Sequence, residues 1–264
     1  MKKYVKLVFI GLLSCIIFIL IWATTVSAVK HIDKAILVES FKARGKLDEA
    51  SSTDKIKYYK IESNETRPAF TKTSGGYVIP GSAGDILTAT TAVIGDGLYP
   101  LIGDALNGFI GFYAGGHAAL CTKDYQDYEF STDEYQSIEA SGTEGEGNNP
   151  SRVNYRSYWA GDIPYKEVIG LRVKLSDKEI DEVMSNCASM LNDPYNFSFI
   201  FDTINNSYCT DILSKAFIKY ANLNKDGFAT TVWDLICSGD TYISYYHYFD
   251  NAGVKHIYYL DWRK

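Results

Sequence analysis

The chain has 264 residues, of which 26 are basic and 32 are acidic, and its formal net charge is −6. A nucleic-acid-binding surface needs clustered lysine and arginine, and no basic run occurs beyond the extreme N-terminus, so this balance argues against a nucleic-acid partner. Apolar residues make up 46% of the chain, which is enough for a sizeable core in one large domain or two small ones.

The N-terminus is predicted to be a membrane segment. A basic lead from Met1 to Lys6 precedes an uncharged apolar run from Leu7 to Ala23, and Val26-Ser27-Ala28 fits the small-residue pattern of a signal-peptidase site. Residues 1–28 are therefore either a cleaved signal peptide or a transmembrane anchor, since the apolar stretch is long enough to span a bilayer. In both alternatives the basic lead stays on the cytoplasmic side of the membrane. We therefore expect an exported protein, which is either anchored in the cell membrane with an extracellular domain or secreted.

Two further segments follow the N-terminal one. Residues 29–74 are predicted to be a stalk or linker, because a partial helical pattern gives way to polar residues and then to a loop at Thr71–Gly76. Residues 75–264 are predicted to form the functional domain. The five cysteines form no Cys-x-x-Cys pair and no cluster with histidine, so neither a metal site nor a cofactor is expected.

Within this domain, short strands and two helices are predicted. Strand patterns occur at Gly84–Thr90, His117–Cys121, Ser137–Ala140 and Val168–Val173, with two aromatic strands in the tail at Tyr245–Phe249 and Ile257–Leu260. Residues 91–115 are rich in glycine and predict a packed connector; a substrate wall or a membrane-facing surface is the alternative. A capping box at Ser176–Glu179 starts one amphipathic helix, and a second helix is predicted to begin near Ser207.

Three residues have the chemistry of a thiol hydrolase. Cys209 is expected in the first turn of the second helix, where the amide dipoles favour a thiolate and its backbone N–H can face an oxyanion. His117 opens a strand of small residues, and Glu139 lies in an apolar stretch where a carboxylate needs a partner. A nucleophile, a base and a carboxylate that orients the base suggest a triad. Each residue alone fits a simpler interpretation: a buried cysteine, a satisfied core histidine and a strand-edge glutamate.

Four short motifs follow one another along the chain. They are Gly84-Asp85-Ile86-Leu87, Gly116-His117-Ala118-Ala119-Leu120, Ile138-Glu139-Ala140 and Tyr208-Cys209-Thr210-Asp211-Ile212-Leu213. In order and context they resemble the permuted NlpC-type cysteine hydrolases, the YiiX/YebB-like group of papain-like amidases, over roughly residues 77–220. Thr210-Asp211 departs from the Ser-Glu that the family tends to have, and the segment after residue 221 has no counterpart in it.

The resemblance implies an α+β, circularly permuted papain-like fold, in which an antiparallel sheet carries His117 and Glu139 and a packed helix carries Cys209. It makes Cys209 the nucleophile, His117 the base and Glu139 the third member of a triad that cleaves amide or ester bonds. Cell-wall peptides, which the unpermuted relatives mostly cleave, are the expected substrates of such an exported hydrolase, and a lipid-linked substrate is the other natural class. Two alternatives stay open: a lipid-directed acyl hydrolase or acyltransferase, and a non-catalytic papain-like binding module.

Overall fold

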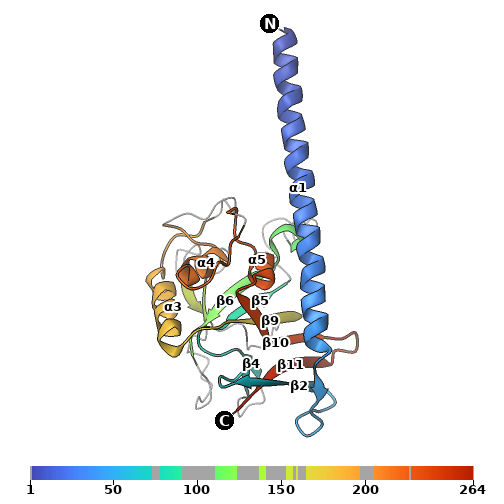
Figure 1. Cartoon of the computed structure of the whole chain (residues 1–264), viewed down its shortest axis with the longest axis vertical. Helices are drawn as coiled ribbons and strands as arrows, with labels where there is room; N and C mark the ends of the chain where they lie inside the picture. Colours follow the sequence, from blue (N-terminus) through green and yellow to red (C-terminus); the bar gives the residue numbers. More distant parts are fainter. Residues whose placement is uncertain are drawn as a thin grey trace.

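The structure is a computed structural model that describes residues 2–72, 78–90, 111–123, 137–140, 153–156, 159, 165–196, 205–225 and 227–263. Its fold is mixed α and β: a mostly antiparallel sheet is accompanied by a few helices, as Figure 1 shows. The expected α+β class is therefore confirmed. Most of the glycine-rich stretch, at residues 91–110, lies outside the described residues, as do residues 124–136 and 141–152.

The main sheet has nine strands in the order β1-β2-β11-β10-β9-β5-β6-β7-β8 within the described part of the chain. The strands are β1 (Lys46–Leu47), β2 (Ile56–Glu65), β5 (Ile86–Ala89), β6 (His117–Cys121), β7 (Ser137–Ala140), β8 (Val153–Arg156), β9 (Glu167–Val173), β10 (Thr241–Phe249) and β11 (Lys255–Trp262). Of these described strands, β2 and β11 pair in parallel, and the other neighbours pair antiparallel. A separate ribbon pairs β3 (Phe70–Lys72) with β4 (Val78–Pro80).

Strands β1 and β2 lie within residues 29–74, which were expected to form a stalk. β2 pairs with β11 along most of its length, and its Tyr58 and Ile61 side chains are buried. A strand that is hydrogen-bonded to the sheet and contributes to the core is part of the domain, so residues 46–65 are not a linker. The expected boundary at residues 74 and 75 falls within residues 73–77, outside the described part of the chain.

Helix α1 (Lys2–Lys42) runs without a break through the expected signal-peptidase site. Its first part projects from the domain in Figure 1, and among the described residues α1 is the one helix long and apolar enough to cross a membrane. Its last part is docked on the domain, because Val38 and Phe41 lie in the core and Lys34 Nζ contacts Glu167 Oε1 at 2.7 Å. The partial helical pattern expected after Ala28 is thus the continuation of the apolar N-terminal helix.

Shorter helices of the described residues pack on the sheet, among them α3 (Asp177–Ser189), α4 (Asp211–Phe217) and α5 (Val232–Cys237). α3 begins as expected, because the Ser176 backbone N–H donates to Glu179 Oε2 at 2.8 Å and closes the capping box. α5 was not expected. Its start carries a capping box as well, in which the Asp234 backbone N–H donates to Thr231 Oγ1 at 3.1 Å.

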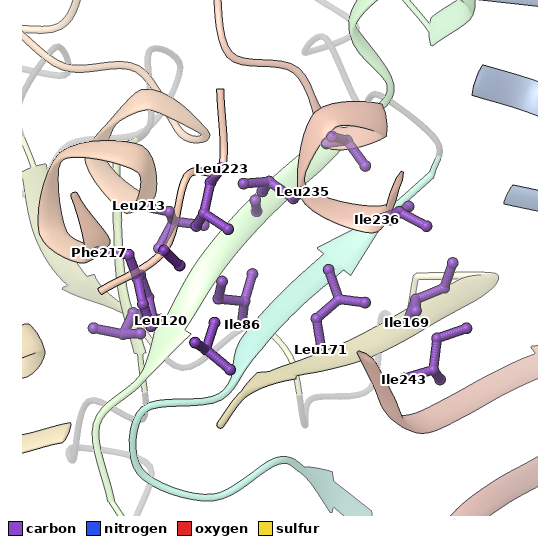
Figure 2. Close-up of a cluster of buried hydrophobic side chains, with 14 of the residues drawn as sticks. Ile86, Leu120, Ile169, Leu171, Leu213, Phe217, Leu223, Leu235, Ile236 and Ile243 are labelled. Carbon is purple, nitrogen blue, oxygen red and sulfur yellow. The ribbon is translucent and has the colours of Figure 1, made fainter. Parts of the chain in front are cut away.

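Two hydrophobic clusters fill the two faces of the sheet. Alternate strand residues enter different clusters: Ile86 and Leu120 pack with α3, α4 and α5, whereas Leu87 and Ala119 pack with the β3–β4 ribbon. Figure 2 shows the first cluster between helices and sheet, with Leu213, Phe217, Leu235 and Ile236 from the helices and Ile86, Leu120, Ile169 and Leu171 from the strands. This packing holds the helices over the strands that carry the site.

Candidate active site

The structure brings His117 and Glu139 together on the neighbouring strands β6 and β7. His117 Nε2–H donates to Glu139 Oε2 at 2.5 Å. The Trp159 indole N–H donates to the same carboxylate oxygen at 3.3 Å, and the Trp159 and His117 rings are parallel with centroids 5.8 Å apart. The carboxylate and the indole together fix the plane of the imidazole, which is the function expected of the third member of a triad.

Strand alternation explains why Glu139 points toward His117. Its neighbours Ile138 and Ala140 enter the core cluster beneath the helices, so Glu139 is directed to the opposite face, where Trp159 lies. Glu139 is only 2% exposed, and its Oε1 has no hydrogen-bond partner among the described residues. A buried carboxylate of this kind needs a compensating positive charge, and a protonated His117 supplies it.

Gly115 allows the backbone before His117 to pass close to α5. Gly115 has φ +81°, a conformation that side chains rarely adopt, and a Cβ at this position would lie 2.4 Å from the Val232 side chain of α5. The backbone before β6 therefore passes directly against α5. This close contact places His117 at the end of the sheet that α5 covers.

Cys209 lies just before α4, not inside it. The expected helix start near Ser207 is four residues too early, because α4 begins at Asp211 with Thr210 as its N-cap residue. Cys209 occupies the turn that leads into the helix, which the Ile212 N–H closes by donating to the Tyr208 carbonyl at 3.2 Å. The cysteine is 9% exposed.

The turn around Cys209 is held from both sides. The Thr210 hydroxyl donates to the Thr230 carbonyl at 2.6 Å, which ties the turn to the segment before α5. On the other side, buried Asp211 accepts the Tyr208 N–H at 2.7 Å and pairs with Lys215 Nζ at 2.8 Å. Thr210 and Asp211 thus fix the position of Cys209.

The third contact of the site joins Cys209 to His117. Burial disfavours the charged imidazole, but Tyr165 and Glu139 beside it and hydrogen bonds to the Cys209 and Glu139 side chains raise the pKa of His117 well above 6.5. Glu139 engages Nε2, so Nδ1 is the ring nitrogen that remains for the thiol proton. The structure therefore brings together all three residues expected from the sequence.

The other histidines have other partners: His256 Nε2 lies 3.0 Å from Asp250 Oδ2, and His31 Nε2 lies 3.0 Å from the Phe112 carbonyl oxygen. All five cysteines are free, so a disulfide between Cys187 and Cys237 is not formed. Burial raises the pKa of Cys187 above its ordinary range, and burial near Asp33 raises the pKa of Cys237 to about 11. His247 is buried between Tyr245 and Tyr165, as expected of a packing residue. Among the described residues, no group of three or more metal-ligating side chains could hold an ion.

Two aromatic residues of the site were not expected. Trp159 and Tyr165 lie 4.7 Å apart between ring centroids, and both flank the His117 ring. Neither residue belongs to a periodic pattern or a short motif, so no signal in the sequence singles them out. Their contact with His117 depends on how the chain returns to the sheet between β8 and β9.

The pKa shifts of His117 and His247 together predict that their contribution to the free energy of unfolding is greatest near pH 6.5. A raised pKa means that folded His117 holds its proton more tightly than the unfolded chain, so its stabilising contribution is lost as the pH rises above 6.5. Burial and Lys255 lower the pKa of His247 despite a bond to the Tyr165 carbonyl, so its contribution is lost as the pH falls below 6.5.

Each histidine can change the free energy of unfolding by up to about 1.4 kcal/mol per pH unit. Chemical unfolding of the full chain at a series of pH values measures both slopes. His117→Gln should remove the loss of stability above pH 6.5 and keep the loss below pH 6.5, which comes from His247. A profile that is unchanged by this substitution would contradict the raised pKa of His117.

No family model matches the chain, and neither the curated proteins nor the solved structures contain a match to it.

Proposed function

We propose that the chain is a thiol hydrolase of amide or ester bonds with a Cys209-His117-Glu139 triad, built on a circularly permuted papain-like fold. The observation that carries the proposal is the His117 ring, which Glu139 Oε2 contacts at Nε2 at 2.5 Å and whose pKa the nearby Cys209 side chain helps to raise. The order of the three residues, with histidine and glutamate on adjacent antiparallel strands before the cysteine, supports the permuted arrangement.

The geometry supports a two-step reaction. His117 takes the thiol proton, and the Cys209 thiolate attacks the substrate carbonyl to form a tetrahedral intermediate, whose oxyanion accepts a hydrogen bond from the Cys209 backbone N–H in this proposal. Collapse of the intermediate leaves a thioester on Cys209, while the protonated His117 gives its proton to the departing amine or alcohol. Water then attacks the thioester with His117 as base, which releases the acid and restores the thiol. Glu139 stabilises the imidazolium in both steps.

One observation favours a second candidate, a non-catalytic papain-like binding module. Cys209 is only 9% exposed, and a sulfur that solvent cannot reach would be inert. Chemical labelling separates the two candidates, because an alkylating reagent reports whether the native thiol can react.

Iodoacetamide is expected to alkylate Cys209 at neutral pH at least about ten times faster than Cys187 or Cys237. The reagent reacts with the thiolate, which the protonated His117 ring stabilises at Cys209, whereas burial raises the pKa of both other thiols. Peptide mapping by mass spectrometry identifies the modified residue. Absence of native labelling at Cys209, with full labelling after unfolding, would favour the binding module.

We also propose that the chain is exported and keeps α1 as its anchor. Ser27, within the expected cleavage motif, is buried against the domain. Thr24 Oγ1 lies 2.7 Å from Tyr113 OH, so this part of α1 belongs to the docked structure. The full chain, with Met1–Ala28 retained, should appear in the membrane fraction and resist an alkaline wash. A soluble extracellular species that begins at Val29 would contradict the anchor.

A further inference from the structure

The contacts of α1 closest to its apolar run involve two segments of the domain. Trp22 packs against Phe228 with ring centroids 5.3 Å apart. Thr24 Oγ1 hydrogen-bonds to Tyr113 OH at 2.7 Å. The segments that carry Phe228 and Tyr113 are therefore the parts of the described domain that meet α1 where it leaves the apolar run. Figure 1 shows the short helical segment at residues 111–114 beside α1, with α5 lower along the helix.

Contacts farther along α1 reach other elements. Lys34 Nζ contacts Glu167 of β9 at 2.7 Å, and Lys42 Nζ lies 5.3 Å from the ring centroid of Tyr248 of β10. The strands of the domain thus lie farther from the apolar run than the two segments. This order along α1 fixes which side of the domain faces a membrane that α1 crosses.

The candidate site belongs to the same two segments. His117 lies four residues after Tyr113, on the strand that the 111–114 turn enters. The other segment holds the nucleophile, because the Thr210 hydroxyl donates to the carbonyl of Thr230, two residues after Phe228. Base and nucleophile are therefore both attached to the side of the domain that faces the membrane.

The length of helix between the apolar run and these contacts is short. An α-helix rises 1.5 Å per residue, so the nine residues from Trp22 to His31, which hydrogen-bonds to the Phe112 carbonyl at 3.0 Å, span roughly 14 Å. The headgroup layer on each side of a bilayer is about 5–8 Å thick. Trp22 and Tyr113 are residues of the kind that gather at this layer. The contact between His31 and the segment before β6 consequently lies within about two headgroup layers of Trp22.

We propose that α1 holds the site at the membrane surface and that the substrate is an acyl ester or amide of a membrane lipid. This inference rests on the proposed thiol hydrolase function and names the substrate class of that site. Cys209 attacks the acyl carbonyl at headgroup level, the lipid alcohol or amine leaves with the proton from His117, and water releases the fatty acid. A lipid substrate thus takes the place of the cell-wall peptide that the family resemblance implies.

The stiffness of the connection supports a lipid over a wall peptide. Val38 and Phe41 of α1 lie in the core, and the helix has no break between this docked part and the apolar run. A wall peptide lies beyond the membrane, and a flexible stalk would serve to reach it. The chain has a rigid docked helix instead, which keeps the site at one height.

The test compares a thiol reagent that is free in solution with the same reagent attached to a membrane lipid. The full chain is placed in vesicles of phosphatidylethanolamine and phosphatidylglycerol and treated either with free iodoacetamide or with an iodoacetamide attached to the headgroup of phosphatidylethanolamine. A variant carries a flexible Gly/Ser insert of about 20 residues between Ala23 and Thr24, whose reach is roughly 25 Å. A matched control carries the same insert after exposed Asn251, in the β10–β11 turn.

The lipid-borne reagent should modify Cys209 in the native chain and in the Asn251 control, and at least about ten times more slowly in the variant, because the insert lowers the effective concentration of lipid at the site. Turnover of a fluorogenic sn-2 acyl ester in the same vesicles should fall in parallel, and free iodoacetamide should react equally with all three.

Equal labelling of variant and control by the lipid-borne reagent, or cleavage of a wall peptide with no cleavage of the acyl lipid, overturns the lipid inference alone. Failure of free iodoacetamide to modify native Cys209 overturns the proposed hydrolase itself, and the lipid inference falls with it.

Discussion

Replacing Cys209 with alanine should abolish hydrolysis of a chromogenic acyl ester, a loss on the order of 10⁶ in rate over the intact triad. Cys121 and Cys187 are buried in the two core clusters, and Cys237 hydrogen-bonds to the Lys30 carbonyl on α1, so we expect none of them to substitute for Cys209. His117→Ala should come close to the same loss, since base and nucleophile act as a unit. The measurement is the rate of ester cleavage by the full chain in detergent.

Glu139→Gln should cause a smaller loss, on the order of 10⁴, because this residue orients the base and does not touch the substrate. His117→Ala should also slow the alkylation of Cys209, since the thiolate loses its cationic neighbour. Cys237→Ala is the matched control and should retain full activity. If His247→Ala or His256→Ala inactivates the chain while His117→Ala does not, the base is misassigned and the permuted papain-like proposal loses its main support.

The elements that the sequence predicted well are those set by local pattern. β6 and β7 have the expected bounds, because small and apolar residues alternate there with the two functional side chains. The capping box at Ser176 places the start of α3 within one residue. These signals lie within a few residues of one another, so they do not depend on how distant parts of the chain meet.

The elements that the sequence did not predict depend on distant contacts. Tyr58–Ile61 has the pattern of a short strand, but β2 joins the sheet through β11, about 200 residues later, and no local signal shows that this strand belongs to the domain and not to a linker. The start of α4 was misplaced because the Ser207 hydroxyl accepts from Lys215 Nζ at 3.1 Å and does not cap the helix. Asp211 satisfies the Tyr208 N–H in its place.

Part of the site was predictable because it is defined by local sequence motifs. Cys209, His117 and Glu139 could be found because each lies in a short motif, and the motifs follow a recognisable order. The stacking of Trp159 on His117 and the contact of α1 with the site side of the domain come from long-range packing. Those contacts carry the inferences about ring orientation and substrate class.

Arg172→Met should destabilise the fold by about 3–5 kcal/mol, which is the usual cost of leaving one partner of a buried ion pair alone. Arg172 is 1% exposed, and its guanidinium forms a bidentate pair with buried Asp85, with Nε and Nη2 at 2.8 and 2.7 Å from the two carboxylate oxygens. Nη1 also contacts Glu65 Oε2 at 2.6 Å, which links β9 to β2. The thermal midpoint of the full chain in detergent should fall by roughly 10 °C.

A matched control separates this buried pair from an ordinary surface pair. Lys46 and Glu62 form an exposed pair at 2.8 Å, and Lys46→Met should leave the midpoint unchanged. The double variant Arg172→Met with Asp85→Asn should recover part of the loss, because the fully buried Asp85 side chain is then no longer a carboxylate without its arginine.

Asp85 is the acidic residue of the Gly-Asp-Ile motif, so this experiment also assigns that motif a structural function in the sheet. Ser82 N–H donates to Asp85 Oδ2 at 3.0 Å, which fixes the turn before β5, and β5 lies between β9 and the strand of His117. Loss of the pair should therefore lower stability more than it alters the chemistry of Cys209. If Arg172→Met keeps the midpoint of the native chain while ester cleavage disappears, Asp85 and Arg172 belong to the reaction and the structural assignment of the motif is wrong.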